Sequence, residues 1–297
     1  LIPVGPDPAS GLVEFAVFGT GTIPERDATG NLPIDQGSAI VLILLPGGST
    51  QVGAAPPLPN EAPDAPHVDT HARNQDGPVV EVSLDPFFIS KYEMTQGQWL
   101  RHTGQNPATY AEGKPWVDKS RPLMHPIETI TWHDAKRVLG QLGLAMPSEA
   151  QWEYATRGGT TTDWWTGDDV RSIDGAGNLG DLTSRNEGGN ADWEFEYWLT
   201  DGWSVHAPVG DYRANPFGLH DVIGNVAEWC GDLWQHWGLN PPRDGDGMSI
   251  GIDEAPVYRG GTYAQDARAA RSACRNGLPG EMRIYNLGVR PARPLMR

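Results

Sequence analysis

The spacing of apolar and polar positions along the chain predicts three helices. The expected helices cover residues 95–104, 131–143 and 147–159. Thr95 can cap the N-terminus of the helix at 95–104, and Thr131 that of the helix at 131–143. The third is the best defined, because Ser148 followed by Gln151 is typical of a capping box and Gly158 can close the helix. In the second, apolar residues recur at helical spacing: Ala135, Val138, Leu139 and Leu142.

Unbroken and alternating apolar runs predict strands in the first hundred residues. Residues 39–45 form an apolar run that meets a Pro-Gly-Gly turn, which is typical of a buried strand. The β-branched segment 79–95 predicts a second strand, whereas the Pro-rich stretch 46–78 predicts a long exposed loop. Turn signals between the short apolar pieces of residues 1–36 indicate an added strand or arm.

Composition and charge add two constraints. The 297 residues include 37 glycines, 26 prolines and 12 tryptophans, and the chain is rich in loop residues from position 160 onward. Buried metal ions or dense tryptophan packing would hold such loops in place. The formal net charge of −16 opposes binding to nucleic acid and anionic membranes but suits cations. No apolar run approaches the ~18 residues of a membrane span, no signal peptide is visible, and an extracytoplasmic location is favoured.

Two short stretches carry oxygen ligands that suit a hard cation. In residues 221–229, Asp221 and Glu228 supply carboxylates around the turn-forming Gly224. The alternative is a turn with a capping aspartate followed by a helical Ala-Glu-Trp. Asn178 and Asp201 form a second candidate pair, for which ordinary turn residues are the alternative.

An ordered set of motifs resembles the formylglycine-generating enzyme family, also called the sulfatase-modifying-factor domain. The motifs include FFISKYEMTQGQW, MPSEAQWEYATRGG, NPFGLHDVIGNVAEW, YRGGTY, ARSACRN and NLGVRPAR. The resemblance covers roughly residues 39–297 and leaves residues 1–38 as an N-terminal extension. The sequence of this extension looks like extensions found on bacterial members of the family. It implies an irregular C-type-lectin-like α+β domain with little regular secondary structure and with structural calcium.

The resemblance also implies two calcium sites, carried over position by position. The first comprises Asn178, the Leu179 carbonyl, Asp201 and the Trp203 carbonyl. The second comprises Asp221, the Gly224 carbonyl, the Val226 carbonyl and Glu228. Carboxylate, amide and carbonyl oxygens of this kind are calcium ligands.

The cysteine pair that binds copper in this family is not found at the matching positions of this chain. The family's name-giving members use two cysteines, five residues apart, that bind copper(I). Aligned on Arg275, the second cysteine falls at Ser272 and the first near Ala267, while Cys274 lies two residues away without a nearby partner. Those members have a tryptophan beside the active site, and the matching position in this chain is Ala227. The sequence therefore predicts a member without the cysteine pair, a candidate pseudoenzyme.

Other side chains favour structural roles. Both cysteines are expected to be buried thiols, with a Cys230–Cys274 disulfide as the alternative. His67 and His71 are expected to be solvated loop residues. The arginines of the C-terminal segment are expected to pair with acids or carbonyls, although an anion pocket is an alternative: Arg268, Arg271, Arg275, Arg283 and Arg290. Three tryptophans are expected to pack in the core: Trp229, Trp234 and Trp237.

Two classes of function stay open. The favoured one is a calcium-stabilised binding module that presents a groove, walled by tryptophans and by residues 260–285, to a peptide, protein or small ligand. The alternative is an oxidoreductase with an unassigned active site, like the branch of the family that acts in pyoverdine maturation. True formylglycine generation is the less favoured activity, and residues 1–38 are a candidate surface for self-assembly.

Overall fold

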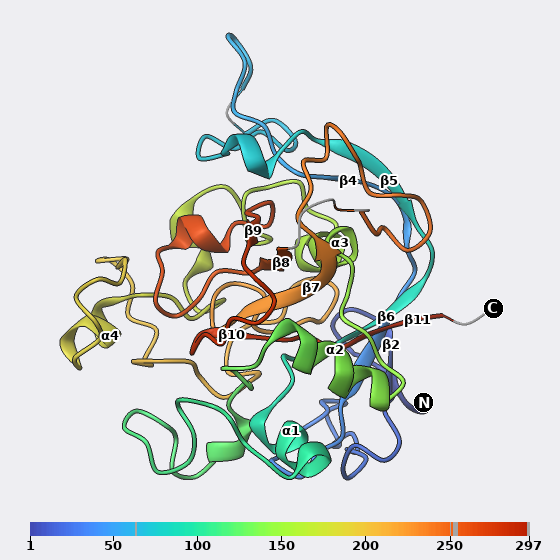
Figure 1. Cartoon of the computed structure of the whole chain (residues 1–297), viewed down its shortest axis with the longest axis vertical. Coiled ribbons are helices and arrows are strands. Elements are labelled where there is room, and N and C mark those ends of the chain that lie inside the picture. Colours follow the sequence, from blue (N-terminus) through green and yellow to red (C-terminus); the bar gives the residue numbers. More distant parts are fainter. Residues whose placement is uncertain (63, 250, 252–254, 296–297) are drawn as a thin grey trace.

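The computed structural model describes residues 1–62, 64–249, 251 and 255–295 (Figure 1). The helices are α1 (Gln96–Thr103), α2 (Trp132–Gln141), α3 (Glu149–Arg157) and α4 (Leu182–Asn186). The longer strands are β1 (Ile2–Pro6), β2 (Val13–Ala16), β3 (Val41–Leu45), β4 (Gly48–Val52), β5 (Val80–Leu84), β6 (Phe87–Ser90), β7 (Ala227–Leu233) and β8 (Pro256–Arg259). Three short strands complete the set: β9 (Asn276–Gly277), β10 (Leu287–Gly288) and β11 (Ala292–Pro294). The mixture of few helices and short strands confirms the α+β class.

The three predicted helices α1, α2 and α3 are confirmed together with their caps. The Thr95, Thr131 and Ser148 hydroxyls each accept a hydrogen bond from the backbone N–H three residues on. In each helix the side chain at that third position returns a bond to the cap, which completes a capping box. Gly104 and Gly158 end α1 and α3 in the left-handed conformation.

A five-stranded antiparallel sheet, in the order β1-β2-β3-β6-β11, forms the centre of the core. Successive residues of a strand face opposite sides of a sheet. Leu42 and Phe88 accordingly pack towards α1 and α2, whereas Ile43 and Ile89 pack in a second apolar cluster that includes Ala150 of α3. The sheet therefore separates two hydrophobic layers that fix the three helices.

The N-terminal residues are part of this sheet. Strand β2 pairs with β3, so residues 1–38 extend the sheet by two strands. Buried charges fasten the extension: Lys91 Nζ lies 2.6 Å from Glu14 Oε1, and Arg26 Nη2 lies 2.7 Å from Glu14 Oε2. The β1–β2 arm thus packs against its own chain.

Two local predictions and one alternative are wrong. The Ala-Glu-Trp segment is not helical but begins β7, which lies between β10 and β8 in a four-stranded sheet. The predicted strand 79–95 is two strands, β5 and β6, interrupted at Asp85-Pro86 because proline cannot donate a ladder hydrogen bond. The predicted loop 46–78 contains β4, which pairs with β5.

The rest of the chain, between α3 and β7 and after β8, follows irregular paths over the centre and left of Figure 1. Buried polar and charged side chains are frequent there, and α4 is its one α-helix among the described residues. No helix among the residues that the structure describes is long and apolar enough to cross a membrane. The Cys274 segment and the predicted metal ligands, apart from Glu228 in β7, lie in this irregular half.

Candidate functional site

The two predicted groups of calcium ligands lie next to each other. The backbone of Asn178 runs beside that of Gly224 as an isolated parallel bridge. The Asn178 N–H donates to the Ile223 carbonyl (3.2 Å), and the Asn225 N–H donates to the Asn178 carbonyl (2.7 Å). A side chain at position 224 would collide with the Asn178 carbonyl, and the φ of Gly224 is +73°. Glycine is therefore required where the two loops meet.

In the first group, Asp201 lies close to a second carboxylate, Asp181, and Asn178 contributes an amide oxygen. Asp201 Oδ2 accepts the Leu179 N–H (2.9 Å) and Oδ1 accepts the Trp203 N–H (3.0 Å). Burial, followed by the charge of Asp181, raises the pKa of Asp201 to about 8. Asn178 Oδ1 is buried and has no hydrogen-bond partner among the described residues. An orphaned oxygen beside a crowded carboxylate fits a cation.

In the second group, Asp221 has the one side-chain oxygen without a hydrogen-bond partner among the described residues. Its Oδ2 accepts the Gly210 N–H (2.7 Å), while Oδ1 is buried without a partner in the described part of the chain. Burial raises the pKa of Asp221 to about 7. Glu228, by contrast, accepts Arg290 Nη2 (2.7 Å) and Trp152 Nε1 (2.6 Å). Asp221 thus fits a calcium ligand, whereas the carboxylate of Glu228 is already satisfied by protein donors.

Glu93 is a buried carboxylate of this region that the sequence analysis missed. Its Oε1 accepts the Val226 N–H (3.0 Å) and its Oε2 accepts Asn225 Nδ2 (2.6 Å). Burial, then the charges of Asp221 and Glu228, raise the pKa of Glu93 well above its usual range. Glu93 lies in the SKYEMT stretch after β6, where no local signal distinguishes it from a surface glutamate. Its partners are more than a hundred positions away, so only the fold reveals its role.

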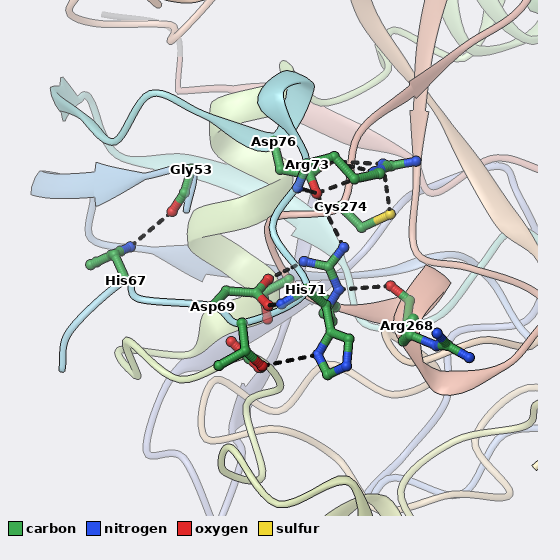
Figure 2. A network of polar contacts seen from close by, with 12 residues as sticks. Gly53, His67, Asp69, His71, Arg73, Asp76, Arg268 and Cys274 are labelled. Atoms are coloured by element: carbon green, nitrogen blue, oxygen red, sulfur yellow. Dashed lines mark hydrogen bonds and ion pairs between the residues drawn. The ribbon is translucent and has the colours of Figure 1, made fainter. Parts of the chain in front are cut away.

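The Cys274 segment lines a pocket of about 440 Å³, which we call the polar pocket. Its lining includes three arginines and two acidic residues, and the residues are His71, Arg73, Glu194, Gln265, Asp266, Arg268, Ala269, Arg271, Cys274 and Asn276. Figure 2 shows Cys274 beside Arg73, whose Nη2 lies 3.1 Å from the sulfur. Burial raises the pKa of the Cys274 thiol, and the nearby Arg73 and Arg271 offset only part of that effect. The thiol is therefore protonated at neutral pH and is a poor nucleophile.

The other positions aligned with the cysteine pair are also buried. Ser272 and Ala267 are 1% and 0% exposed, and Ala267 begins a short 3₁₀ turn. Cys230 lies inside β7, where burial raises its pKa well above the usual range. Both cysteines are free thiols, as expected, and the alternative disulfide is not formed.

Of the two histidines expected to be solvated, His71 is exposed but His67 is not. His67 is buried, and its Nδ1 lies 3.1 Å from the Gly53 carbonyl. His71 is exposed, as expected, but its backbone N–H donates to Asp69 Oδ1 (2.7 Å). The Pro-rich loop folds onto the domain at this point, because the buried Asp69 and Asp76 pair with Arg271.

The C-terminal arginines and tryptophans mostly have the expected structural roles. Five arginines pair with acids, namely Arg268, Arg271, Arg275, Arg283 and Arg290. Trp229 and Trp237 are buried, and Trp234 is partly buried. The expected tryptophan wall is absent from the described lining of the polar pocket. Trp116 and Trp193 instead line a separate pocket of about 250 Å³, the aromatic pocket, with Tyr110 and Tyr285.

Comparisons with known proteins agree with this arrangement. The formylglycine-generating enzyme of Thermomonospora curvata is 26% identical, over 75% of this chain and 82% of the relative. The enzyme of the same name from Streptomyces coelicolor is 32% identical, over 57% of this chain and 52% of the relative, so the match spans about half of its length. The solved structure of PvdO from Pseudomonas aeruginosa has the same fold, with a TM-score of 0.63 at 23% identity over 86% of this chain and 95% of PvdO.

The resemblance seen in the motifs and the irregular, C-type-lectin-like architecture are thus confirmed. The model of the sulfatase-modifying factor enzyme 1-like domain matches residues 32–295, which is most of the chain. This protein belongs to the sulfatase-modifying factor enzyme 1-like (formylglycine-generating enzyme-like) family.

Proposed function

We propose that this domain is a calcium-stabilised binding module whose ligand site is the polar pocket. The observation that carries the proposal is the state of Cys274: a single buried thiol, bonded to Arg73, with a raised pKa. Copper(I) chemistry needs two thiolates that can approach one metal. The second cysteine of the chain, Cys230, is buried inside β7. The pocket therefore retains the shape of a ligand site without the family's thiolate pair.

The polar pocket suits a ligand that carries a carboxylate. Arg73 and Arg268 line it with partly exposed guanidinium groups, 42% and 66% accessible. Each also pairs with an aspartate, so a ligand carboxylate would share these groups. Guanidinium groups bind carboxylates in bidentate geometry. Asn276 adds a neutral side-chain amide to the lining. A short peptide with a free carboxyl terminus has the required charge, size and hydrogen-bonding groups.

Calcium at the two predicted sites would stabilise the loops that frame the domain. Asn178 and Asp201, with the Leu179 and Trp203 carbonyls, would hold one ion, while Asp221, with the Gly224 and Val226 carbonyls, would hold the other. The orphaned oxygens of Asn178 and Asp221 support this assignment. Glu228 would join the second site only by giving up a bond to Arg290 or Trp152. A bound ion would supply positive charge where buried carboxylates outnumber arginines.

Metal content and catalysis distinguish the module from the parent enzyme. We expect the purified protein to contain calcium and no stoichiometric copper or iron, as measured by plasma mass spectrometry. Incubation with copper(I) and a cysteine-containing sulfatase peptide should yield no aldehyde by mass spectrometry. Stoichiometric copper, or aldehyde formation, would contradict the proposal.

Ligand binding is tested with a pool of short peptides that have free carboxyl termini. We expect selected peptides to bind, and Arg268→Glu to abolish binding because it reverses a charge in the pocket. Arg283→Glu is the matched control, since Arg283 is also exposed and paired with an acid, Asp134, but does not line this pocket. Equal loss in both variants would show a general effect of net charge instead.

An oxidoreductase is the second candidate, and one observation favours it. Two buried histidines lie behind the aromatic pocket: His125 Nδ1 is 2.8 Å from His206 Nδ1, and Tyr110 packs edge-on against His206. Because the Asp118 N–H donates to His125 Nε2 (3.1 Å), the proton of His125 resides on Nδ1. His206 then carries its proton on Nε2, which lies 3.8 Å from a Glu128 oxygen.

His206 Nε2 is buried without a hydrogen-bond partner among the described residues, so the pair would exchange a proton with a substrate only if that substrate reached this nitrogen from the aromatic pocket. Oxygen consumption with a panel of phenolic substrates would test it. Turnover that disappears in His206→Asn, in a protein that still melts cooperatively, would favour the oxidoreductase over the binding module.

A further inference from the structure

A cluster of three metal-ligating side chains lies at the edge of the polar pocket. Asp69, His71 and Asp163 each offer a ligand atom, and these atoms all lie within 4.8 Å of one another. The three come from two loops that are ninety positions apart in the sequence, so the arrangement is a product of the fold. None of them belongs to the two predicted calcium sites.

The backbone around the cluster is held in place before any ion binds. Asp69 is buried, its Oδ2 pairs with Arg271 and its Oδ1 accepts the N–H of His71 (2.7 Å), so an ion would share these oxygens with protein donors. On the other loop, the Asp163 N–H donates to Asp168 Oδ1 (2.9 Å), and its carbonyl accepts the Ser272 N–H (2.8 Å). Figure 2 shows Asp69 and His71 in the same network of contacts as Arg73 and Cys274.

The Asp163 carboxylate has no donor to satisfy it. It accepts no hydrogen bond and forms no ion pair with any residue in the described part of the chain, although it is half-buried. Burial, followed by the charges of Asp69 and Asp168, raises the pKa of Asp163 to about 7. Arg271 is committed to Asp69 and Asp76. A cation between Asp69 and Asp163 would offset the repulsion between the two carboxylates.

The donor set selects a class of metal. Calcium and magnesium take oxygen ligands, whereas an imidazole beside two carboxylates suits zinc and other divalent first-row metals. Ligands of a tetrahedral zinc lie about 3.3 Å apart. The His71 side chain is exposed and its Nδ1 lies 3.3 Å from Thr70 Oγ1, so the turn that closes the present spacing would replace this one contact. His71 also lines the polar pocket, so the cluster lies at the edge of that cavity.

We propose that Asp69, His71 and Asp163 bind one divalent first-row transition-metal ion, of which zinc is the probe, at the edge of the polar pocket. Three protein ligands leave a position for water or for an oxygen of a ligand in the pocket. The site is distinct from the predicted calcium sites and from the copper chemistry of the family. It stands whether or not the pocket binds a carboxylate.

Zinc titration of the full chain, in buffer that contains millimolar calcium, tests the site. We expect isothermal titration to give one zinc ion per chain that calcium does not displace. His71→Ala and Asp163→Asn should each weaken zinc binding by at least about tenfold, because each removes a direct ligand. His102→Ala is the matched control, since His102 is an exposed histidine on α1. Melting in calcium without zinc checks that every variant is folded.

The spectrum of the cobalt(II) protein identifies the ligands independently. Nitrogen and oxygen ligands should give visible d–d bands without the near-ultraviolet charge-transfer band of a thiolate, which would reveal Cys274. The proposal is overturned if zinc does not bind, if His71→Ala binds zinc as tightly as His102→Ala, if calcium competes on equal terms, or if thiolate bands appear. Zinc affinity and the cobalt spectrum are measured without peptide or aldehyde detection, so the test of the metal site is independent of the proposed function.

Discussion

Two buried charge networks hold the irregular half of the molecule, and they are balanced in different ways. In the arginine network, Arg259 and Arg275 face Glu149 and Glu153 at 2.6–2.8 Å. In the carboxylate network, Arg290 pairs with Glu228 and lies near Glu93 and Asp221. Among the described residues no arginine pairs with Asp181 or Asp201. Both networks join segments that are distant in the sequence.

The pKa shifts reflect this difference. Burial alone would raise the pKa of Glu153, but the charges of Arg157 and Arg259 lower it below its usual range. The pKa values of Glu93, Asp201 and Asp221 are all raised, because burial and neighbouring carboxylates dominate. The first network thus contains its own cations, whereas the second has an excess of negative charge that an external cation would neutralise.

Removal of one cation from the arginine network should have the largest effect. Arg259→Leu leaves Glu149 and Glu153 short of a buried partner and also removes the guanidinium from between Trp152 and Trp237. Breaking such a pair costs about 3–5 kcal/mol. Urea unfolding followed by circular dichroism should show this loss or a failure to fold. Arg283→Leu, at an exposed ion pair, should change stability by less than about 1 kcal/mol.

Removal of calcium by a chelator should destabilise the carboxylate network and leave the arginine network unaffected. If calcium is present at 100 times its Kd, its removal by EGTA costs about 2.7 kcal/mol per site. We expect a matching fall in melting temperature that added calcium reverses. Asp201→Asn should reduce the calcium-dependent part of the stability, whereas Arg283→Leu should retain it. A melting temperature that EGTA leaves unchanged in the wild-type protein would contradict the calcium assignment.

The contrast also shows how far sequence reasoning extends. The α3 helix was predictable because its cap, capping box and terminal glycine are local signals. The family motifs placed Asn178, Asp201 and Asp221 in two ligand groups, but the contact between those groups is visible only in the fold. Glu93 and the Asp69–His71–Asp163 cluster depend on contacts between distant loops, for which no local pattern exists. The Ala-Glu-Trp residues of β7 are compatible with a helix, which was the alternative considered for this segment. They form a strand because the segment pairs with β8.

Acid should weaken the arginine network by a smaller amount. The pKa of Glu153 is lower in the folded protein than in the unfolded chain, so the unfolded chain binds protons first as pH falls. Its stabilising contribution is present above about pH 4.5 and is lost as pH falls through the folded pKa. We expect urea midpoints, measured in saturating calcium, to decrease as pH falls below about 4.5.

Glu153→Gln provides the control for this titration. The variant should be less stable at pH 7, because Arg157 and Arg259 lose a charged partner, but its stability should depend less on pH over the same range. An unchanged pH dependence in Glu153→Gln would assign the acid sensitivity to other carboxylates.

The smallest expected effect concerns Cys274, which lies between the arginine-rich loops without carrying charge. Its sulfur accepts bonds from Arg73 Nη2 (3.1 Å) and Asn276 Nδ2 (3.7 Å), and a serine oxygen can accept both. Cys274→Ser should therefore alter the free energy of unfolding by less than about 1 kcal/mol and leave peptide binding and the EGTA response unchanged. Loss of a measurable oxidase activity on this substitution would instead identify the thiol as functional. Because its pKa is raised by burial, the wild-type thiol should also react slowly with iodoacetamide at pH 7 in the folded protein and rapidly in urea.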